Sequence, residues 1–137
     1  MMNIANVLYS FGDNITYNKL KKLIMEDDKS MTTTIEEAVQ RIRKLNYNAQ
    51  KIETLDVFNA NQRFPMICKI SSTHVVAVYK GQIFDAESRY TMTLNDTNLD
   101  IACGAGTEFH GISKSYLLIP NTKTLKRITM ISSAKLK

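Results

Sequence analysis

The two residues best suited to acid–base chemistry are His74 and Asp85. His74 opens an apolar, β-branched run, and Asp85 ends a second such run that follows Lys80-Gly81. A two-residue turn at Lys80-Gly81 makes the two side chains diagonal cross-strand neighbours on one face of a hairpin. A carboxylate at that position can fix the histidine tautomer and leave the other ring nitrogen to act as a base. The same spacing also fits a hydrogen-bonded pair that only stabilises the sheet.

The elements that must position this pair are helices in the first third of the chain and mainly strands afterwards. Apolar residues at helical spacing predict helices over 2–11, 16–26 and 34–45, the last with a capping box of Thr34 and Glu37. Apolar and β-branched runs predict strands over 48–53, 65–70, 74–79, 82–86, 115–119 and 124–131, with one helical turn at 54–58 and a loop over 95–111. This order predicts an α+β domain whose N-terminal helices pack on a C-terminal antiparallel sheet.

Length and cysteine count exclude several classes of protein. The chain has 137 residues, 44% of them apolar and 23% charged, which fits a single domain over 1–137. Two cysteines, Cys68 and Cys103, exclude a disulfide framework and a zinc site of four cysteines. There is no apolar run of about 20 residues to span a membrane, and the N-terminus lacks the cationic lead-in of a signal peptide. We therefore expect a cytoplasmic protein.

A cofactor or metal site is not indicated by the sequence. Gly104-Ala-Gly106 is shorter than a phosphate-binding loop and lacks the Lys-Ser/Thr that follows one. Cys103 and His110 have the chemistry of metal ligands, but two further ligands have no visible source. We expect no cofactor.

The basic excess of the chain lies in its last fifth. Residues 109–137 hold six Lys or Arg and no acid, whereas the formal net charge of the whole chain is +5. We expect this region to form a final strand and a tail, with Lys123, Lys126 and Arg127 as candidates for binding an acidic protein or a nucleic acid. The alternative is a solvated basic surface that has no specific partner.

The segment His74-Val-Val-Ala-Val-Tyr-Lys-Gly-Gln-Ile-Phe-Asp85 resembles the histidine-to-aspartate hairpin of papain-like cysteine peptidases. The likeness is greatest to the small papain-like proteins of tailed phages and bacteria, and it covers about residues 2–90, with similar segments at 12–23, 32–47 and 54–70. The resemblance implies a papain-like fold with His74 as the base and Asp85 as the orienting acid. It aligns the nucleophilic cysteine of the family with Met2, whose thioether cannot form a thiolate.

This departure at Met2 leaves three functions open. The first is a catalytically inactive papain-like protein of phage type that binds a host or viral macromolecule as an inhibitor or adaptor. The second is an active cysteine peptidase or amidase in which Cys103 or Cys68 acts with His74 and Asp85, although Cys68 also suits a buried apolar position. The third is a nucleic-acid-associated protein that uses the basic C-terminal region.

Overall fold

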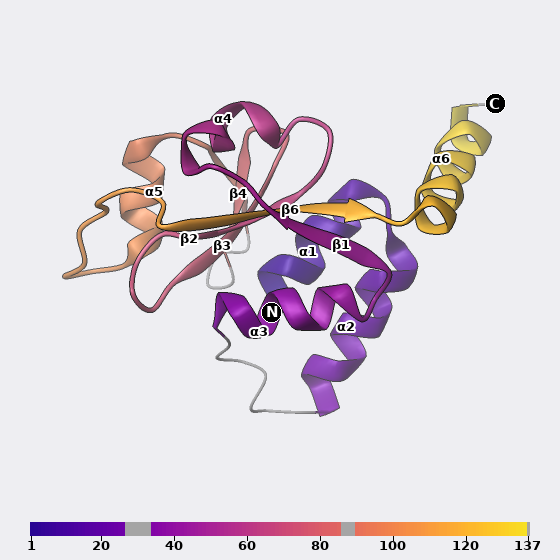
Figure 1. Cartoon of the computed structure of the whole chain (residues 1–137), viewed down its shortest axis with the longest axis horizontal. Helices are drawn as coiled ribbons and strands as arrows, with labels where there is room; N and C mark the ends of the chain where they lie inside the picture. The colour runs from indigo at the N-terminus through magenta and orange to yellow at the C-terminus, as the bar shows by residue number, and fades with distance from the viewer. Residues whose placement is uncertain (27–33, 86–89, 137) are drawn as a thin grey trace.

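The computed structural model describes residues 1–26, 34–85 and 90–136 (Figure 1). The helices are α1 (Met2–Phe11), α2 (Asn14–Glu26), α3 (Ile35–Arg43), the 3₁₀ turn η2 (Thr54–Asp56), α4 (Val57–Ala60), α5 (Asp96–Cys103) and α6 (Thr122–Leu136). The strands are β1 (Tyr47–Lys51), β2 (Met66–Lys69), β3 (Val75–Tyr79), β4 (Gln82–Phe84), β5 (Met92–Thr93) and β6 (Lys114–Pro120). Within these ranges, no helix combines the length and the apolarity needed to cross a lipid bilayer.

The described strands form one antiparallel sheet in the order β1-β6-β2-β3-β4-β5. The strand β6 lies between β1 and β2, although it follows both in the sequence, so the C-terminal third of the chain completes the middle of the sheet. The α+β class predicted from the order of helices and strands is confirmed.

The hairpin of β3 and β4 has the register expected from its turn residues. Tyr79 pairs with Gln82, and the turn between them has positive φ at both Lys80 (48°) and Gly81 (73°). Two positive φ angles are typical of the tight turn whose twist matches that of the two strands. The buried side chain of Asn61 holds this turn, since its Oδ1 accepts a hydrogen bond from the Gly81 N–H at 2.7 Å.

Each face of the sheet has its own hydrophobic core. The helices α1, α2 and α3 cover one face, where Ile4, Leu8, Leu20 and Ile42 pack against alternate strand residues. The segment η2–α4 and the helix α5 cover the other face, where Val57, Leu99 and Ala102 pack against the intervening strand residues. Figure 1 shows these two groups of helices on opposite sides of the sheet. Because both faces are buried, the central strand β3 is apolar at every position from Val75 to Tyr79.

The N-terminal helices have the boundaries that their capping residues require. Thr34 Oγ1 accepts a hydrogen bond from the Glu37 N–H at 3.2 Å, which confirms the predicted start of α3. The helix α2 begins at Asn14, two residues earlier than predicted, because Asp13 Oδ1 supplies the cap by accepting a hydrogen bond from the Thr16 N–H at 3.1 Å. Between α1 and α2, Gly12 has a φ of 102°, a conformation that glycine adopts more readily than other residues.

Two predictions for the C-terminal half are wrong. Residues 96–103, predicted as part of a loop, form α5, because Asn95 Oδ1 caps the helix through the Asn98 N–H at 2.8 Å and Leu99 faces the core. Residues 124–131, predicted as a strand, belong to α6, because Asn121 Oδ1 accepts the Thr124 N–H at 2.8 Å and starts a helical turn. The described part of the basic region therefore consists of a loop over 109–113, the strand β6 and the long helix α6.

Candidate functional site

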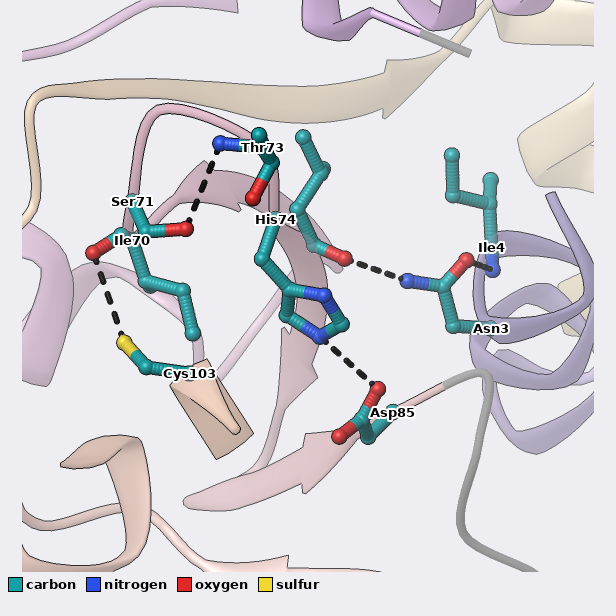
Figure 2. A network of polar contacts seen from close by, with 9 residues as sticks. Asn3, Ile4, Ile70, Ser71, Thr73, His74, Asp85 and Cys103 are labelled. Carbon is teal, nitrogen blue, oxygen red and sulfur yellow. Dashed lines mark hydrogen bonds and ion pairs between the residues drawn. The ribbon is translucent and has the colours of Figure 1, made fainter. Parts of the chain in front are cut away.

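His74 and Asp85 form a side-chain pair at the open end of the β3–β4 hairpin. His74 immediately precedes β3 and Asp85 immediately follows β4. The distance from His74 Nε2 to Asp85 Oδ1 is 3.0 Å (Figure 2). Asp85 is buried and 8% exposed, whereas His74 is partly exposed. The contact expected from the sequence is therefore present.

This contact assigns different roles to the two ring nitrogens. An ionised carboxylate can only accept a hydrogen bond, so the tautomer of His74 that pairs with an ionised Asp85 carries its proton on Nε2. In the neutral imidazole, Nδ1 is then the nitrogen with the basic lone pair. A carboxylate that holds a histidine in one tautomer is the geometry that a general base requires.

The first turn of α1 is fixed beside this pair. Asn3, which is buried, donates from Nδ2 to the backbone carbonyl of Val75 at 2.9 Å, and Val75 directly follows His74. The Asn3 Oδ1 accepts the Ile4 N–H at 2.9 Å, which fixes the amide orientation (Figure 2). Met2, adjacent to Asn3, is therefore held at the N-terminus of a helix near the pair, where the helix dipole favours negative charge.

A cavity adjoins the pair and was not predicted from the sequence. Asp85 lines an open cavity of about 370 Å³ together with Asn6, Tyr9 and Ser10 of α1. The lining is completed by Phe84, Tyr90 and Thr91. Tyr9 is 58% exposed despite lying on a largely buried helix. The spacing of three and four residues along 6–10 marks one helical face and is the signal that would have found this wall.

The two cysteines lie in positions that keep their thiols protonated. Cys103 ends α5, and its Sγ donates to the Ile70 carbonyl at 3.6 Å (Figure 2). Burial raises the pKa of the Cys103 thiol, and the Asp100 carboxylate raises it further. Cys68 lies in β2 with no exposed surface, and burial raises its pKa to about 12. Reactive cysteines have the opposite environment, in which the thiolate is stabilised.

The three basic candidates differ in their surroundings. Lys123 and Lys126 are exposed on α6, which extends beyond the end of β6 (Figure 1). Arg127 turns inward, and its Nη1 lies 2.9 Å from Asp13 Oδ1. Arg127 is therefore an anchor of α6 on the α1–α2 turn, and its sequence-based assignment as a partner-binding residue overlooked this ion pair.

Asp13 is the centre of a buried polar network that the sequence did not reveal. Its Oδ2 accepts hydrogen bonds from the Thr16 hydroxyl at 2.6 Å and from the Tyr47 hydroxyl at 2.7 Å. Burial opposes ionisation of Asp13, but the hydrogen bonds from Thr16, Tyr47 and Arg127 outweigh it and keep the pKa of the carboxyl below its usual value. Burial and the neighbouring Asp13 raise the pKa of Tyr47, which stays a neutral donor. The network joins the helices α2 and α6 to β1.

Metal ligands are not clustered in the part of the chain that the structure describes, where no group of three or more His, Cys, Asp or Glu residues could hold an ion. Of the predicted pair of Cys103 and His110, the thiol is buried and the imidazole is exposed, and His110 Nε2 lies 3.9 Å from Glu108 Oε2.

Comparison with known proteins finds no family model, no curated protein and no solved structure that matches this chain. The function must therefore be argued from the chemistry of the site.

Proposed function

We propose that this chain is a catalytically inactive papain-like protein of phage type that binds a host or viral macromolecule as an inhibitor or adaptor. The observation that carries the proposal is the arrangement at the end of the β3–β4 hairpin. A histidine–aspartate pair with a 3.0 Å contact lies beside a helix N-terminus that presents Met2 and Asn3 instead of a cysteine.

The physical argument for inactivity concerns the nucleophile. A papain-like mechanism needs a thiolate, which a helix N-terminus and a nearby imidazole stabilise. The helix N-terminus and the imidazole are both present, but Met2 has no ionisable proton. The alternative peptidase or amidase would have to use Cys103 or Cys68, and burial raises the pKa of both thiols. The raised pKa of both thiols therefore favours the binding function over the peptidase or amidase.

The test of inactivity uses a peptide-based electrophile that modifies cysteine peptidases. We expect the native protein to remain unmodified by intact mass spectrometry, because both thiols are buried and protonated. Modification of Cys103 or Cys68 that disappears in a His74→Ala variant would show an active enzyme and overturn the proposal.

The papain-like arrangement itself is tested by restoring a thiol. In Met2→Cys, the helix N-terminus and His74 should stabilise the thiolate, so iodoacetamide should react about tenfold faster near neutral pH than with an ordinary thiol. The matched control is Thr122→Cys, which places an exposed thiol in the first turn of a different helix, α6. Thr122 is not part of the site proposed around His74. Equal rates in the two variants, or an enhancement that persists in Met2→Cys with His74→Ala, would refute the alignment.

A second candidate, binding to nucleic acid, is favoured by the exposure of Lys123 and Lys126 on the extended helix α6. Binding to a 20-base-pair duplex should then weaken steeply with salt, and each Lys→Ala change should lower the slope of log K against log salt by about 1. Lys51→Ala, an exposed change in β1, is the control. Absent binding, or a slope that Lys51→Ala lowers equally, would exclude this function.

We also propose a cytoplasmic site of action. Both cysteines are unpaired thiols in the structure, which is the ordinary state of cysteine in a reducing compartment.

A further inference from the structure

A second hollow lies on the sheet face covered by α4 and α5, away from the histidine–aspartate pair. It is an open groove of about 750 Å³ between the segment 55–58, the helix α5 and the loop that leads into β6. Its lining joins Leu55 and Phe58 to Phe109, His110 and Ile112, together with three acidic side chains. Neither His74 nor Asp85 belongs to this set, so the groove is independent of the site described above.

The lining of the groove includes apolar side chains that the fold leaves exposed. Leu55 is 89% exposed and Phe58 is 44% exposed, on adjacent turns of η2 and α4. Phe109 and Ile112 are half-buried and continue this surface from the other side. Large apolar side chains grouped in a hollow are typical of a surface that binds another molecule, whereas isolated exposed ones are ordinary.

The charged side chains that line the groove are acidic, in contrast to the chain as a whole. Asp96, Asp100 and Glu108 contribute three negative charges, and the described lining residues include no Lys or Arg. The formal net charge of the chain is +5, so this local acidity runs against the overall charge. The potential inside the groove therefore attracts a cation and repels an acidic or phosphorylated segment.

The walls are held by hydrogen bonds within the protein. Asp100 Oδ1 accepts the Phe109 N–H at 2.9 Å, which fastens the loop to α5. Ser113 N–H donates to the Lys69 carbonyl at 3.0 Å, which fastens the same loop to β2. A groove formed before binding avoids part of the entropy that a partner would otherwise have to offset by contacts.

We propose that this groove is a docking site for a basic segment of a partner protein, in which Lys or Arg residues meet the acidic side chains of the lining and an apolar side chain packs on Leu55 and Phe58. The charge selects the class of partner, and the apolar lining residues supply the contact area that fixes it in place. The proposal does not depend on catalytic inactivity or on the papain-like resemblance, because it uses no residue of that site.

The experiment uses three fluorescent 14-residue probe peptides and measures anisotropy with the full chain. The first peptide combines Lys or Arg with leucines, the second has serine at the leucine positions, and the third has glutamate at the basic positions. Only the first should bind. Leu55→Ser and Glu108→Lys should each weaken its binding at least about tenfold. The matched controls are Met25→Ser and Glu26→Lys, two exposed changes on α2 that should leave binding unaltered.

Several outcomes would overturn the proposal. The first is that the peptide of basic residues and leucines does not bind. The second is that the peptide with serine in place of leucine binds equally well, which would show an effect of charge alone. The third is that Met25→Ser or Glu26→Lys lowers the affinity as much as Leu55→Ser or Glu108→Lys does. Sedimentation of the unmodified chain provides a further test. Self-association that disappears in Leu55→Ser would identify the occupant as a second copy of this chain and would overturn the assignment to a different protein.

Discussion

Replacement of Asp13 by asparagine tests how the basic helix α6 is held on the protein. The Asp13 side chain has no exposed surface and interacts with Thr16, Tyr47 and Arg127 at 2.6 to 2.9 Å through its side-chain oxygens. Asparagine keeps the shape of the side chain but removes the charge and turns one acceptor oxygen into a donor. A donor then faces either Arg127 or the two hydroxyl groups.

The magnitude follows from the contacts that are lost. Hydrogen bonds to a charged group contribute about 1.5–3 kcal/mol each, and the loss of one partner of a buried ion pair costs about 3–5 kcal/mol. Arg127 is 28% exposed and recovers part of its hydration, so we expect Asp13→Asn to lower the free energy of unfolding by about 3 kcal/mol. For a chain of this length, that corresponds to a fall of about 10 °C in Tm.

The dependence on pH has a definite sign. The native contacts lower the pKa of Asp13, so its ionised form stabilises the folded state above the pKa of the unfolded chain, about 3.9. This stabilisation is complete near pH 6. It is lost as the pH falls below about 4 toward the lowered pKa that Asp13 has in the folded protein. Urea unfolding of the unmodified chain and of Asp13→Asn should therefore show a difference in the free energy of unfolding that becomes smaller in acid.

The matched control is Asp56→Asn, a change at an exposed carboxylate, which should alter stability by less than about 0.5 kcal/mol. A double-mutant cycle of Asp13→Asn and Arg127→Gln should give a coupling free energy between the two side chains of at least about 1 kcal/mol. A loss below 1 kcal/mol in Asp13→Asn, or a difference that stays constant from pH 6 to pH 3, would refute the assignment of Asp13 as the charged anchor.

Two further predictions concern the turns that position α1 and the β3–β4 hairpin. Gly12→Ala should destabilise the protein by about 1–2 kcal/mol, because its φ of 102° strains an L-residue, while the added Cβ would make an ordinary van der Waals contact with Ile128 at 3.4 Å; Gly111→Ala, with a φ of 111° and open space around it, should cost a similar amount. Thermal unfolding of both variants checks this, and an unchanged Tm in both variants would contradict the backbone strain. Asn61→Ala should cost about 2–3 kcal/mol and increase the amide hydrogen exchange of Gly81, which loses its acceptor. An unchanged exchange rate would show that Asn61 does not hold the turn.

The sequence by itself determined the parts of the protein that local rules govern. The capping pair Thr34 and Glu37 fixed the start of α3, and Lys80-Gly81 fixed the turn and register of β3 and β4. Since side chains alternate along strands, this register was sufficient to predict the contact of His74 with Asp85. These features depend on neighbours within a few residues or across one short turn.

Only the tertiary structure decided the features that join distant segments. The β-branched residues in 124–131 favoured a strand, but the Asn121 cap and the packing of Ile128 on the α1–α2 turn made a helix. The pairing of Asp13 with Arg127 and the placement of Asn3 beside Val75 join residues far apart in the chain. Such contacts depend on the relative positions of packed elements, which periodicity and spacing within one segment do not encode.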